Sequence, residues 1–494
     1  MGALLLGVDI GTSSSKGVLA TSDGEVLAVA ERAHTTSMPQ PGWFEHDPAM
    51  WWADCRDILR ELTAAARSRG EVAGVAVSGI GPCVLVTDDA GTPLRPAILY
   101  GVDTRATAEI AELQQRLGAQ GMLAWGGSPL TSQAVGPKLL WLQRHEPQVW
   151  ERARRFFMAS SWLVHRLTGE YVLDHHSASQ CNPLYDLAAA RWRDSVGVDL
   201  WGGMARPALQ WPGDSAGSVT AAAAGETGVP AGTPVVAGTI DAWSEALSIG
   251  VEAPGSLMLM YGTTMFMVAA ADSARPDERI WQTAGVQPHT RTVAAGMATS
   301  GAVTAWLRDV TGGAPFEALI DEAAATPPGA DALVVLPYFA GERTPLFDPL
   351  ARGTIAGLTL RHTRGHLYRA VLEGTAMGVR HNLEVFEQVG VETSVLRAVG
   401  GGTRGSLWTQ VVSDVLGRPQ QIPACTVGAA YGDALLAARG AGVVDPSAQW
   451  YETAACVEPD ARTRDVYGEL YGVYRRLYES TRDEVHALAR LQLG

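Results

Sequence analysis

The chain contains 494 residues, which is too long for one typical hydrophobic core, so we expect two domains or more. Hydrophobic residues make up 47% of the chain and charged residues 18%, a balance typical of folded proteins rather than disordered ones. The formal net charge of −14 argues against a nucleic-acid partner, because nucleic-acid backbones need clustered cations.

Apolar runs and turn residues predict alternating strands and helices along the first half of the chain. In chain order we expect a strand at 4–8, its hairpin partner within 16–30, a helix after Asp47, a strand at 72–80, helices near 105–117 and 138–143, and a strand at 233–237. The first helix is the best delimited, since Asp47 suits its N-cap, Pro48 its first position and Gly70 its stop. This alternation indicates an α/β protein.

A second apolar hairpin begins the second half of the chain. Gly262–Thr264 lies between two apolar strands, as Gly11–Ser13 does near the start. The recurrence indicates a duplicated domain, although two unrelated Gly-Thr hairpins would give the same pattern. Asp9 has no counterpart because Met260 occupies its place, so only one of the two hairpins carries an acid.

The remaining elements of the second half are predicted from the same signals. They are a helix at 299–310, a strand at 332–339, a long helix from about 366 to 389, a strand at 395–399, a glycine turn and helix at 400–416, and a helical C-terminal segment. The glycine turn formally matches Gly-x-Gly-x-x-Gly. A dinucleotide site, simple helix–strand packing and a nucleotide lying against the glycines are the three open interpretations.

Other sequence features bear on the chemistry and the compartment. The chain contains no Gly-Lys pair, which excludes a Walker-type phosphate loop. Five cysteines without a Cys-x-x-Cys pair favour a reducing cytoplasm. No apolar run approaches the length of a membrane span, so we expect no membrane partner.

Asp241 follows an apolar strand and precedes a predicted helix in "GTIDAWSEALSIG". Two interpretations fit that position equally well. The carboxylate can cap the helix, or it can project from the strand end as a catalytic base.

Five ordered motifs resemble the FGGY family of carbohydrate kinases. They are "GVDIGTSSSKGVL", "GTIDAW", "YGTTMF", "GTIAGLTLRHTRGHLYRAVLEG" and "GGGTRGSLWTQVVSDVLGRP". The resemblance implies two actin-like (RNase H-like) ATPase domains with the active site in the interdomain cleft, at 1–247 and 248–494. It also implies ATP and Mg2+ as cofactors, a small sugar or polyol as substrate, and a homodimer as the assembly to test.

The resemblance assigns roles to residues of this chain. Asp241 would be the general base on the acceptor hydroxyl, and Asp9 would orient Mg2+ through water. The residues implied to contact ATP or its phosphates are Gly11, Thr12, Ser13, Lys16, Gly262, Thr263, Thr264, Gly301, Gly401, Gly402 and Ser406.

The expected sugar side departs from the family. Where xylulokinases usually carry Gln-Met-His-Gly, this chain has Pro82 and Cys83 in place of the last two residues. Gly101 replaces a common aromatic residue, whereas Asp103 and Arg105 keep their family types. Pro82, Cys83, Asp103 and Asp241 are the predicted substrate contacts.

A ketose such as a pentulose is the predicted acceptor. Gluconate, a polyol or ribulose are alternatives within the family. An actin-like ATPase without a small-molecule acceptor is the alternative from another class.

Overall fold

The computed structural model describes residues 2–493, which divide into two compact units. The first unit holds the residues up to Glu252 together with Gln282–Thr292 and Val427–Tyr451. The second holds Ala253–Trp281, Val293–Thr426 and the residues from Glu452 on. The units are therefore composed differently from the continuous segments 1–247 and 248–494, because two later segments pack within the first unit.

The first unit is built on a mixed sheet with the strand order β13-β14-β5-β1-β2-β3, and β15 also pairs with β5. These strands are β1 (Gly2–Ile10), β2 (Ser14–Thr21), β3 (Val26–Ala33), β5 (Gly70–Gly79), β13 (Ser215–Ser218), β14 (Pro234–Val236) and β15 (Thr239–Ile240). The central strand β1 pairs antiparallel with β2 and parallel with β5. This pairing confirms the predicted hairpin at the start of the chain.

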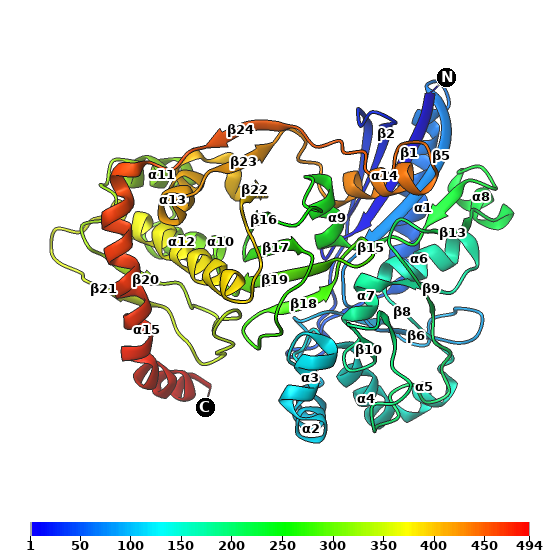
Figure 1. Ribbon diagram of the computed structural model, residues 1–494, viewed down its shortest axis with the longest axis horizontal. Helices are drawn as coiled ribbons and strands as arrows, with labels where there is room; N and C mark the ends of the chain where they lie inside the picture. Colours follow the sequence, from blue (N-terminus) through cyan, green and yellow to red (C-terminus); the bar gives the residue numbers. More distant parts are fainter. Residues whose placement is uncertain (1, 494) are drawn as a thin grey trace. The chain divides into compact units, whose positions relative to one another are not determined.

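Helices cover both faces of this sheet. α14 (Ala429–Gly440) packs on β1 and β5, and α1 (Pro48–Ala66) packs on β1, β2 and β3 (Figure 1). A Cβ atom on Gly7 would lie 2.0 Å from a carbonyl oxygen of α14, so only glycine permits this approach. α1 is capped by Asp47 as predicted, but it ends at Ala66, and Gly70 instead begins β5.

Further short elements complete the first unit. They are β4 (Glu45–His46), β6 (Leu85–Thr87), β7 (Ala97–Ile98), α2 (Thr107–Leu117), α3 (Ala119–Gly126), α4 (Val135–His145), α5 (Pro147–Arg152), β8 (Arg155–Phe157), α6 (Ala159–Thr168), β9 (Val172–Asp174), α7 (His175–Ser179), β10 (Tyr185–Asp186), β11 (Arg191–Trp192), β12 (Ala208–Gln210), α8 (Ala221–Thr227), α9 (Asp241–Ser248) and most of β18 (Trp281–Ala284).

The second unit repeats the same pairing pattern. Its sheet runs β19-β17-β16-β22-β23-β24, and its central strand β16 pairs antiparallel with β17 and parallel with β22. The strands are β16 (Ser256–Tyr261), β17 (Met265–Ala271), β19 (Arg291–Met297), β22 (Val395–Val399), β23 (Gln420–Pro423) and β24 (Thr453–Val457). The recurrence confirms the predicted duplication of the hairpin.

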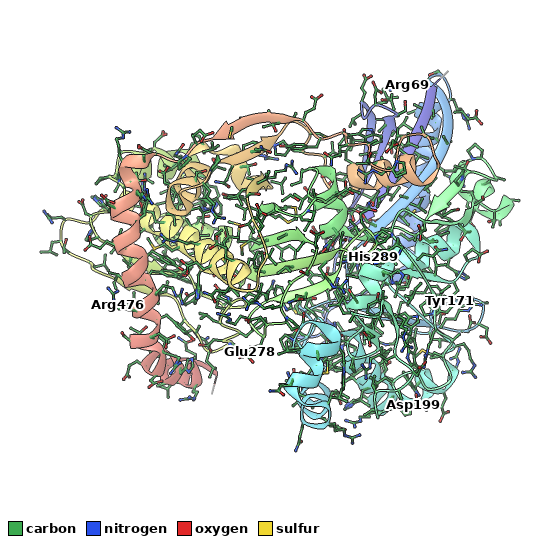
Figure 2. All side chains as sticks on the ribbon, viewed as in Figure 1. Arg69, Tyr171, Asp199, Glu278, His289 and Arg476 are labelled. Carbon is green, nitrogen blue, oxygen red and sulfur yellow. The ribbon has the colours of Figure 1, made fainter. Side chains whose placement is uncertain are left out.

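The helices of the second unit enclose an extensive apolar core. They are α10 (Gly301–Val310), α11 (Phe316–Ala324), α12 (Arg364–Gln388), α13 (Ser406–Leu416), α15 (Arg464–Leu493) and the 3₁₀ helices η1 (Gly401–Arg404) and η2 (Ala461–Thr463), with β20 (Val334–Leu336) and β21 (Thr354–Ala356) as a short hairpin. Charged side chains such as Arg69, Asp199 and Arg476 point outward from the ribbon in Figure 2. Each unit combines a central sheet with packed helices, so both units are α/β, as predicted.

Candidate active site

The turn between β1 and β2 opens into a small pocket of about 250 Å³ within the first unit. Polar groups of this turn and the start of α14 form most of its wall. The lining residues are Asp9, Gly11, Thr12, Ser13, Ser14, Lys16, Glu245, Val427, Gly428, Ala429 and Ala430.

The turn itself has its carbonyl oxygens occupied by the protein. His34 Nε2 donates to the Gly11 carbonyl at 3.0 Å, Thr36 Oγ1 to the Thr12 carbonyl at 3.0 Å, and the His34 amide to the Ser13 carbonyl at 2.9 Å. Among residues 2–493, no protein acceptor pairs with the amides of Thr12 and Ser13. Free amides at a glycine turn are suited to binding phosphate oxygens.

Asp9 lies two residues before this turn, where β1 meets both of its neighbours. In the ladder it stands opposite Lys16 of β2 and Ser78 of β5. Burial, Asp241 and Asp433 hold the pKa of Asp9 well above its ordinary range, while the Ser78 hydroxyl opposes this rise. The structure therefore gathers at one strand end carboxylates that are far apart in the sequence.

Asp241 is the first residue of α9, directly after β15. Its carboxylate accepts a hydrogen bond from the Ala242 amide at 2.7 Å, so it does interact with the start of the helix. It lies close enough to Asp9 to raise the pKa of that group, and burial raises its own pKa to about 6. A carboxylate with that pKa is deprotonated at neutral pH and can still accept a proton.

Asp433 is a member of this cluster that sequence reasoning missed. It lies fully buried on α14, where Ser244 donates to its Oδ1 at 2.6 Å. Ser78 Oγ lies 2.7 Å from Asp433 Oδ2 and 2.9 Å from Asp9 Oδ1. The available signal was a single acid within the apolar helical run "GAAYGDALLAA".

Hydrogen counting requires that one of the two carboxyl groups in this chain of contacts hold a proton. The Ser78 hydroxyl has one hydrogen and can donate it to one carboxylate only. If it donates to Asp9, then Asp433 must carry a proton and donate it to Ser78. Burial raises the pKa of Asp433 to about 7, so this group can hold a proton up to neutral pH.

Glu245 is a second residue that the sequence did not single out. It lines the pocket from α9, and a Cβ atom on Gly428 would lie 2.8 Å from its Oε2. Burial and Asp241 raise its pKa to about 7, whereas Lys16 acts to lower it. Lys16 thus faces an excess of acidic groups.

The predicted sugar contacts Cys83 and Asp103 are both buried in this structure. Cys83 is fully buried, and burial raises the pKa of its thiol to about 12. Both oxygens of Asp103 bind Arg105, and the Phe44 amide donates to one of them at 2.7 Å. Asp103 therefore holds Arg105 in place, and the assignment of both residues to the sugar stays a prediction. Pro82 is also buried, after a cis peptide bond.

Gly101 has a polar neighbour in place of the missing aromatic ring. Its amide donates to Gln133 Oε1 at 3.0 Å, and a Cβ atom on Gly101 would lie 2.8 Å from the Gln133 amide carbon. The preceding residue, Tyr100, places its hydroxyl 3.2 Å from Thr12 Oγ1. Lys138 donates to the carbonyls of Leu99 and Tyr100 at 2.6 and 3.1 Å, and so fixes this segment.

The corresponding turn of the second unit, between β16 and β17, is held by backbone groups. The amides of Ser300 and Ala302 donate to the Thr263 carbonyl, and the Gly301 amide donates to the Gly262 carbonyl at 3.0 Å. A Cβ atom on Gly301 would lie 2.7 Å from that same Gly262 oxygen. Gly301 is therefore needed for the contact between the turn and α10, and its amide is already used there. Thr264 closes the turn by accepting from the Gly262 amide at 3.1 Å.

The glycine-rich segment 400–405 forms the 3₁₀ helix η1 rather than a dinucleotide-type turn. A Cβ atom on Gly402 would lie 2.8 Å from the Trp408 ring and 2.9 Å from Tyr261 Cβ, whereas Gly401 has open space beside it. Ser406 is exposed at the start of α13. Gly402 thus serves packing, and Gly401 and Ser406 are free to meet a ligand.

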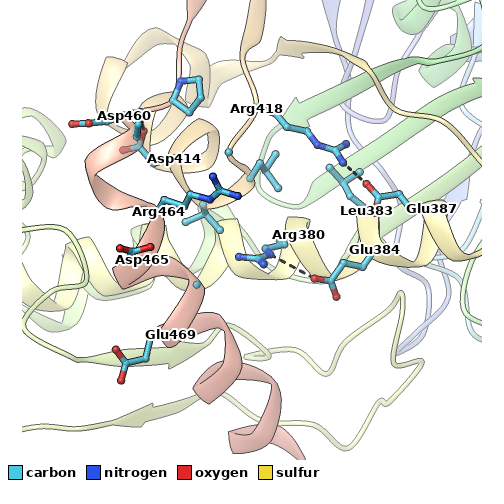
Figure 3. Close-up of a pocket in the computed structure, with 16 residues that line it drawn as sticks. Arg380, Leu383, Glu384, Glu387, Asp414, Arg418, Asp460, Arg464, Asp465 and Glu469 are labelled. Carbon is cyan, nitrogen blue, oxygen red and sulfur yellow. Dashed lines mark hydrogen bonds and ion pairs between the residues drawn. The ribbon is translucent and has the colours of Figure 1, made fainter.

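A larger pocket of about 740 Å³ lies in the second unit, at the ends of α12 and α13 and the start of α15 (Figure 3). Two of its three arginines are engaged by nearby acids. Arg380 pairs with Glu384 at 3.5 Å, and Arg418 pairs with Glu387. None of the predicted site residues lines this pocket.

The side chains that line the first-unit pocket determine whether it can hold a metal ion. Within residues 2–493, no group of three or more His, Cys, Asp or Glu side chains is arranged to hold a metal ion. Asp9 and Glu245 nevertheless line the pocket beside Lys16, and Asp241 lies close to Asp9, so carboxyl groups outnumber amino groups here. This arrangement fits Mg2+, which keeps several waters and arrives with the phosphates of its nucleotide.

Within residues 2–493, none of the helices has both the length and the apolar character needed to span a membrane.

The duplicated α/β units and a glycine turn with an acid beside it are typical of actin-like ATPase domains. The chain matches the N-terminal domain of the FGGY family of carbohydrate kinases over residues 4–248 and the C-terminal domain over residues 257–441. It therefore belongs to the FGGY family of carbohydrate kinases. It is a phosphotransferase that uses ATP and acts on a small sugar.

Relatives and solved structures agree with this membership. The chain is 30% identical to a xylulose kinase of Escherichia coli K12, over 96% of this chain and 99% of that protein. It is also 30% identical to a glycerol kinase of Nocardia farcinica, over 90% of this chain and 92% of that protein. The crystal structure of a xylulose kinase from Rhodospirillum rubrum is similar with a TM-score of 0.91 and 36% identity, covering 98% of this chain and 100% of that one.

Proposed function

We propose that this protein transfers the terminal phosphoryl group of MgATP to a hydroxyl of a ketose, with a pentulose such as xylulose as the leading candidate. The observation that carries the proposal is the place of Asp241. It stands at the start of α9 beside Asp9, and Asp9 in turn lines the pocket formed at the amide-bearing turn.

Asp241 would accept the proton of the attacking hydroxyl. An alcohol is a weak nucleophile until its proton has an acceptor, and a carboxylate within hydrogen-bond reach supplies one. Phosphoryl transfer otherwise depends on positioning and charge neutralisation rather than on covalent help from the protein. The amides of Thr12 and Ser13, together with Lys16, would position the phosphates and offset their negative charge.

Asp9 would hold Mg2+ through water. When bound, the ion would offset negative charge on the phosphate groups. The hydrogen bond from Ser78 orients one oxygen of Asp9 and leaves the other for a water of the ion. In the second unit, Thr263, Thr264, Gly401 and Ser406 remain proposed nucleotide contacts.

The pentulose assignment is supported by the names of the relatives, most of which are xylulose kinases. Gln133 beside Gly101 gives the sugar side a polar amide where the family often has an aromatic ring. The Nocardia relative makes glycerol or another polyol the second candidate, and gluconate and ribulose remain alternatives.

A screen of ADP release over pentuloses, hexuloses, pentitols, glycerol and aldonates tests the substrate. We expect the largest kcat/KM with a pentulose. A larger value with glycerol or gluconate would replace that assignment and leave the kinase chemistry intact. The homodimer is a separate proposal, which analytical ultracentrifugation tests, and the cytoplasmic location is another, which cell fractionation tests.

A further inference from the structure

A layer of polar side chains lies directly beneath the turn between β1 and β2. His34, just after β3, reaches both the turn and Asp54 of α1: its Nε2 lies 3.0 Å from the Gly11 carbonyl, and its Nδ1 lies 2.9 Å from Asp54 Oδ2. Ser15 Oγ also donates to Asp54 Oδ2 at 2.7 Å. The side chains of His34 and Asp54 are only 5% and 15% exposed, so water does little to replace these contacts.

Hydrogen counting assigns a proton to this pair. A carbonyl oxygen can only accept, so His34 Nε2 must carry a hydrogen. A neutral ring would then present a bare Nδ1 lone pair to the Asp54 carboxylate, which is repulsive. Both contacts are favourable only if the pair holds one further proton, and imidazole is a stronger base than a carboxylate. His34 is then an imidazolium, and the pair has no net charge.

A neighbouring histidine gives the opposite result by the same counting. Trp51 Nε1 donates to His46 Nδ1 at 3.1 Å, so His46 carries its hydrogen on Nε2. That nitrogen lies 2.9 Å from Thr36 Oγ1, which in turn donates to the Thr12 carbonyl. Burial lowers the pKa of His46 to about 4, in agreement with a neutral ring. The two rings lie 5.3 Å apart, and only His34 faces a carboxylate.

We infer that His34 is a positioning residue for nucleotide binding, and that its proton is what balances the charge of Asp54 beneath the phosphate-binding turn. This inference rests on the proposed function. The imidazolium holds the Gly11 carbonyl inward, which leaves the amides of Thr12 and Ser13 facing the pocket. Without that proton, a buried negative charge would lie beneath the site of the phosphates and weaken their binding.

The test uses charge rescue, because a purely structural role would not produce it. His34→Gln leaves Asp54 without its partner charge, and we expect the Kd for MgATP, measured by calorimetry without sugar, to rise about tenfold. Adding Asp54→Asn removes the unbalanced charge and should bring the Kd back to within about threefold of the wild type. Asp54→Asn alone keeps the pair neutral and should change the Kd by less than about threefold.

A matched control is available in the second unit. His486 pairs with Asp348 at 2.6 Å, away from any predicted site residue. His486→Gln therefore removes a histidine–aspartate pair of the same kind and should leave the Kd for MgATP unchanged. A double variant of His34 and Asp54 that binds as weakly as His34→Gln, or more weakly, would overturn the inference.

Nitrogen-15 NMR of the histidine side chains gives an independent readout that does not depend on turnover. We expect both ring nitrogens of His34 to carry hydrogen in the full-length wild type, and only Nε2 to do so in Asp54→Asn. A neutral His34 ring in the wild type would contradict the inference. A wild type that binds MgATP but phosphorylates no sugar would instead contradict only the proposed acceptor.

Discussion

The two Gly-Thr turns occupy equivalent places in sheets with the same strand pairing, yet the protein holds them in different ways. Side chains from just after β3 donate to the carbonyl oxygens of the first turn. Backbone amides at the start of α10 donate to those of the second. The first turn is thus supported in part by side chains, and the second by backbone groups.

The strands before the turns differ in the same sense. Asp9 stands opposite Lys16 across the first hairpin, whereas Met260 stands opposite Phe266 across the second. An apolar pair stabilises a hairpin by packing alone, but an acid–base pair also sets the local charge. The first hairpin therefore carries ionisable side chains next to its turn, whereas the second carries apolar side chains there.

The largest effect is expected from Asp241→Asn, which removes the proposed base and keeps its size. We expect kcat to fall about a thousandfold, because general-base catalysis contributes about 10²–10⁴-fold. The Kd for MgATP should stay within about twofold, since the turn amides are untouched. Coupled ADP release and calorimetry measure the two quantities. As a control, Asp309→Asn at an exposed position of α10 should behave as the wild type. Near-normal kcat in Asp241→Asn would rule out Asp241 as the base.

The pH dependence of turnover tests the same group without mutation. Burial raises the pKa of Asp241 to about 6, and a base must be deprotonated to act. The value of kcat/KM for the sugar should therefore be flat above pH 7 and fall about tenfold per pH unit well below pH 6. Circular dichroism at pH 5 separates this loss from unfolding. A profile that stays flat down to pH 5 would show that Asp241 does not limit the reaction.

How far the sequence predicts this site depends on how local each signal is. Apolar strands around a Gly-Thr turn predict both hairpins, and an acid at a strand end points to Asp241. Asp433 was missed because it reaches the site through the packing of α14 on β1, a contact between opposite ends of the chain. A polar residue near a strand end also looks the same whether it faces a ligand or an internal partner. Asp103 is such a case, and its neighbour Arg105 was the available signal.

Because the backbone of Gly301 lies close to the second turn, we expect one added methyl group at this position to destabilise the protein. In Gly301→Ala the new Cβ would lie 2.7 Å from the Gly262 carbonyl oxygen, so the backbone contact must open. We expect the Tm to fall by several degrees, from about 1–3 kcal/mol of lost stability. Gly401→Ala is the matched control, because nothing lies within 4 Å of its Cβ, and its Tm should not change. Equal melting temperatures for both variants would show that the second turn tolerates adjustment.

The smallest kinetic effect is expected at Asp433, the buried acid beneath the first turn. An asparagine there can donate to Ser78 as a protonated aspartate does, so Asp433→Asn should keep kcat/KM within about twofold. Asp433→Ala leaves Ser78 and Ser244 without this partner and should lose about tenfold. If Asp433 acts as an anion instead, the asparagine variant will be as impaired as the alanine variant.

Thermal stability gives the same substitution a pH signature. Burial raises the pKa of Asp433 from 3.8 to about 7, so the folded state holds this proton more tightly than the unfolded chain does. The wild type then loses stability as the pH rises between these two values, and asparagine does not. Asp433→Asn should match the wild-type Tm at an acidic pH where both states are protonated and exceed it at pH 8, where its free energy of unfolding should be larger by up to about 4 kcal/mol. Because Met260 and Phe266 leave the second hairpin without such a group, their replacement by leucine should give a pH-independent change in Tm.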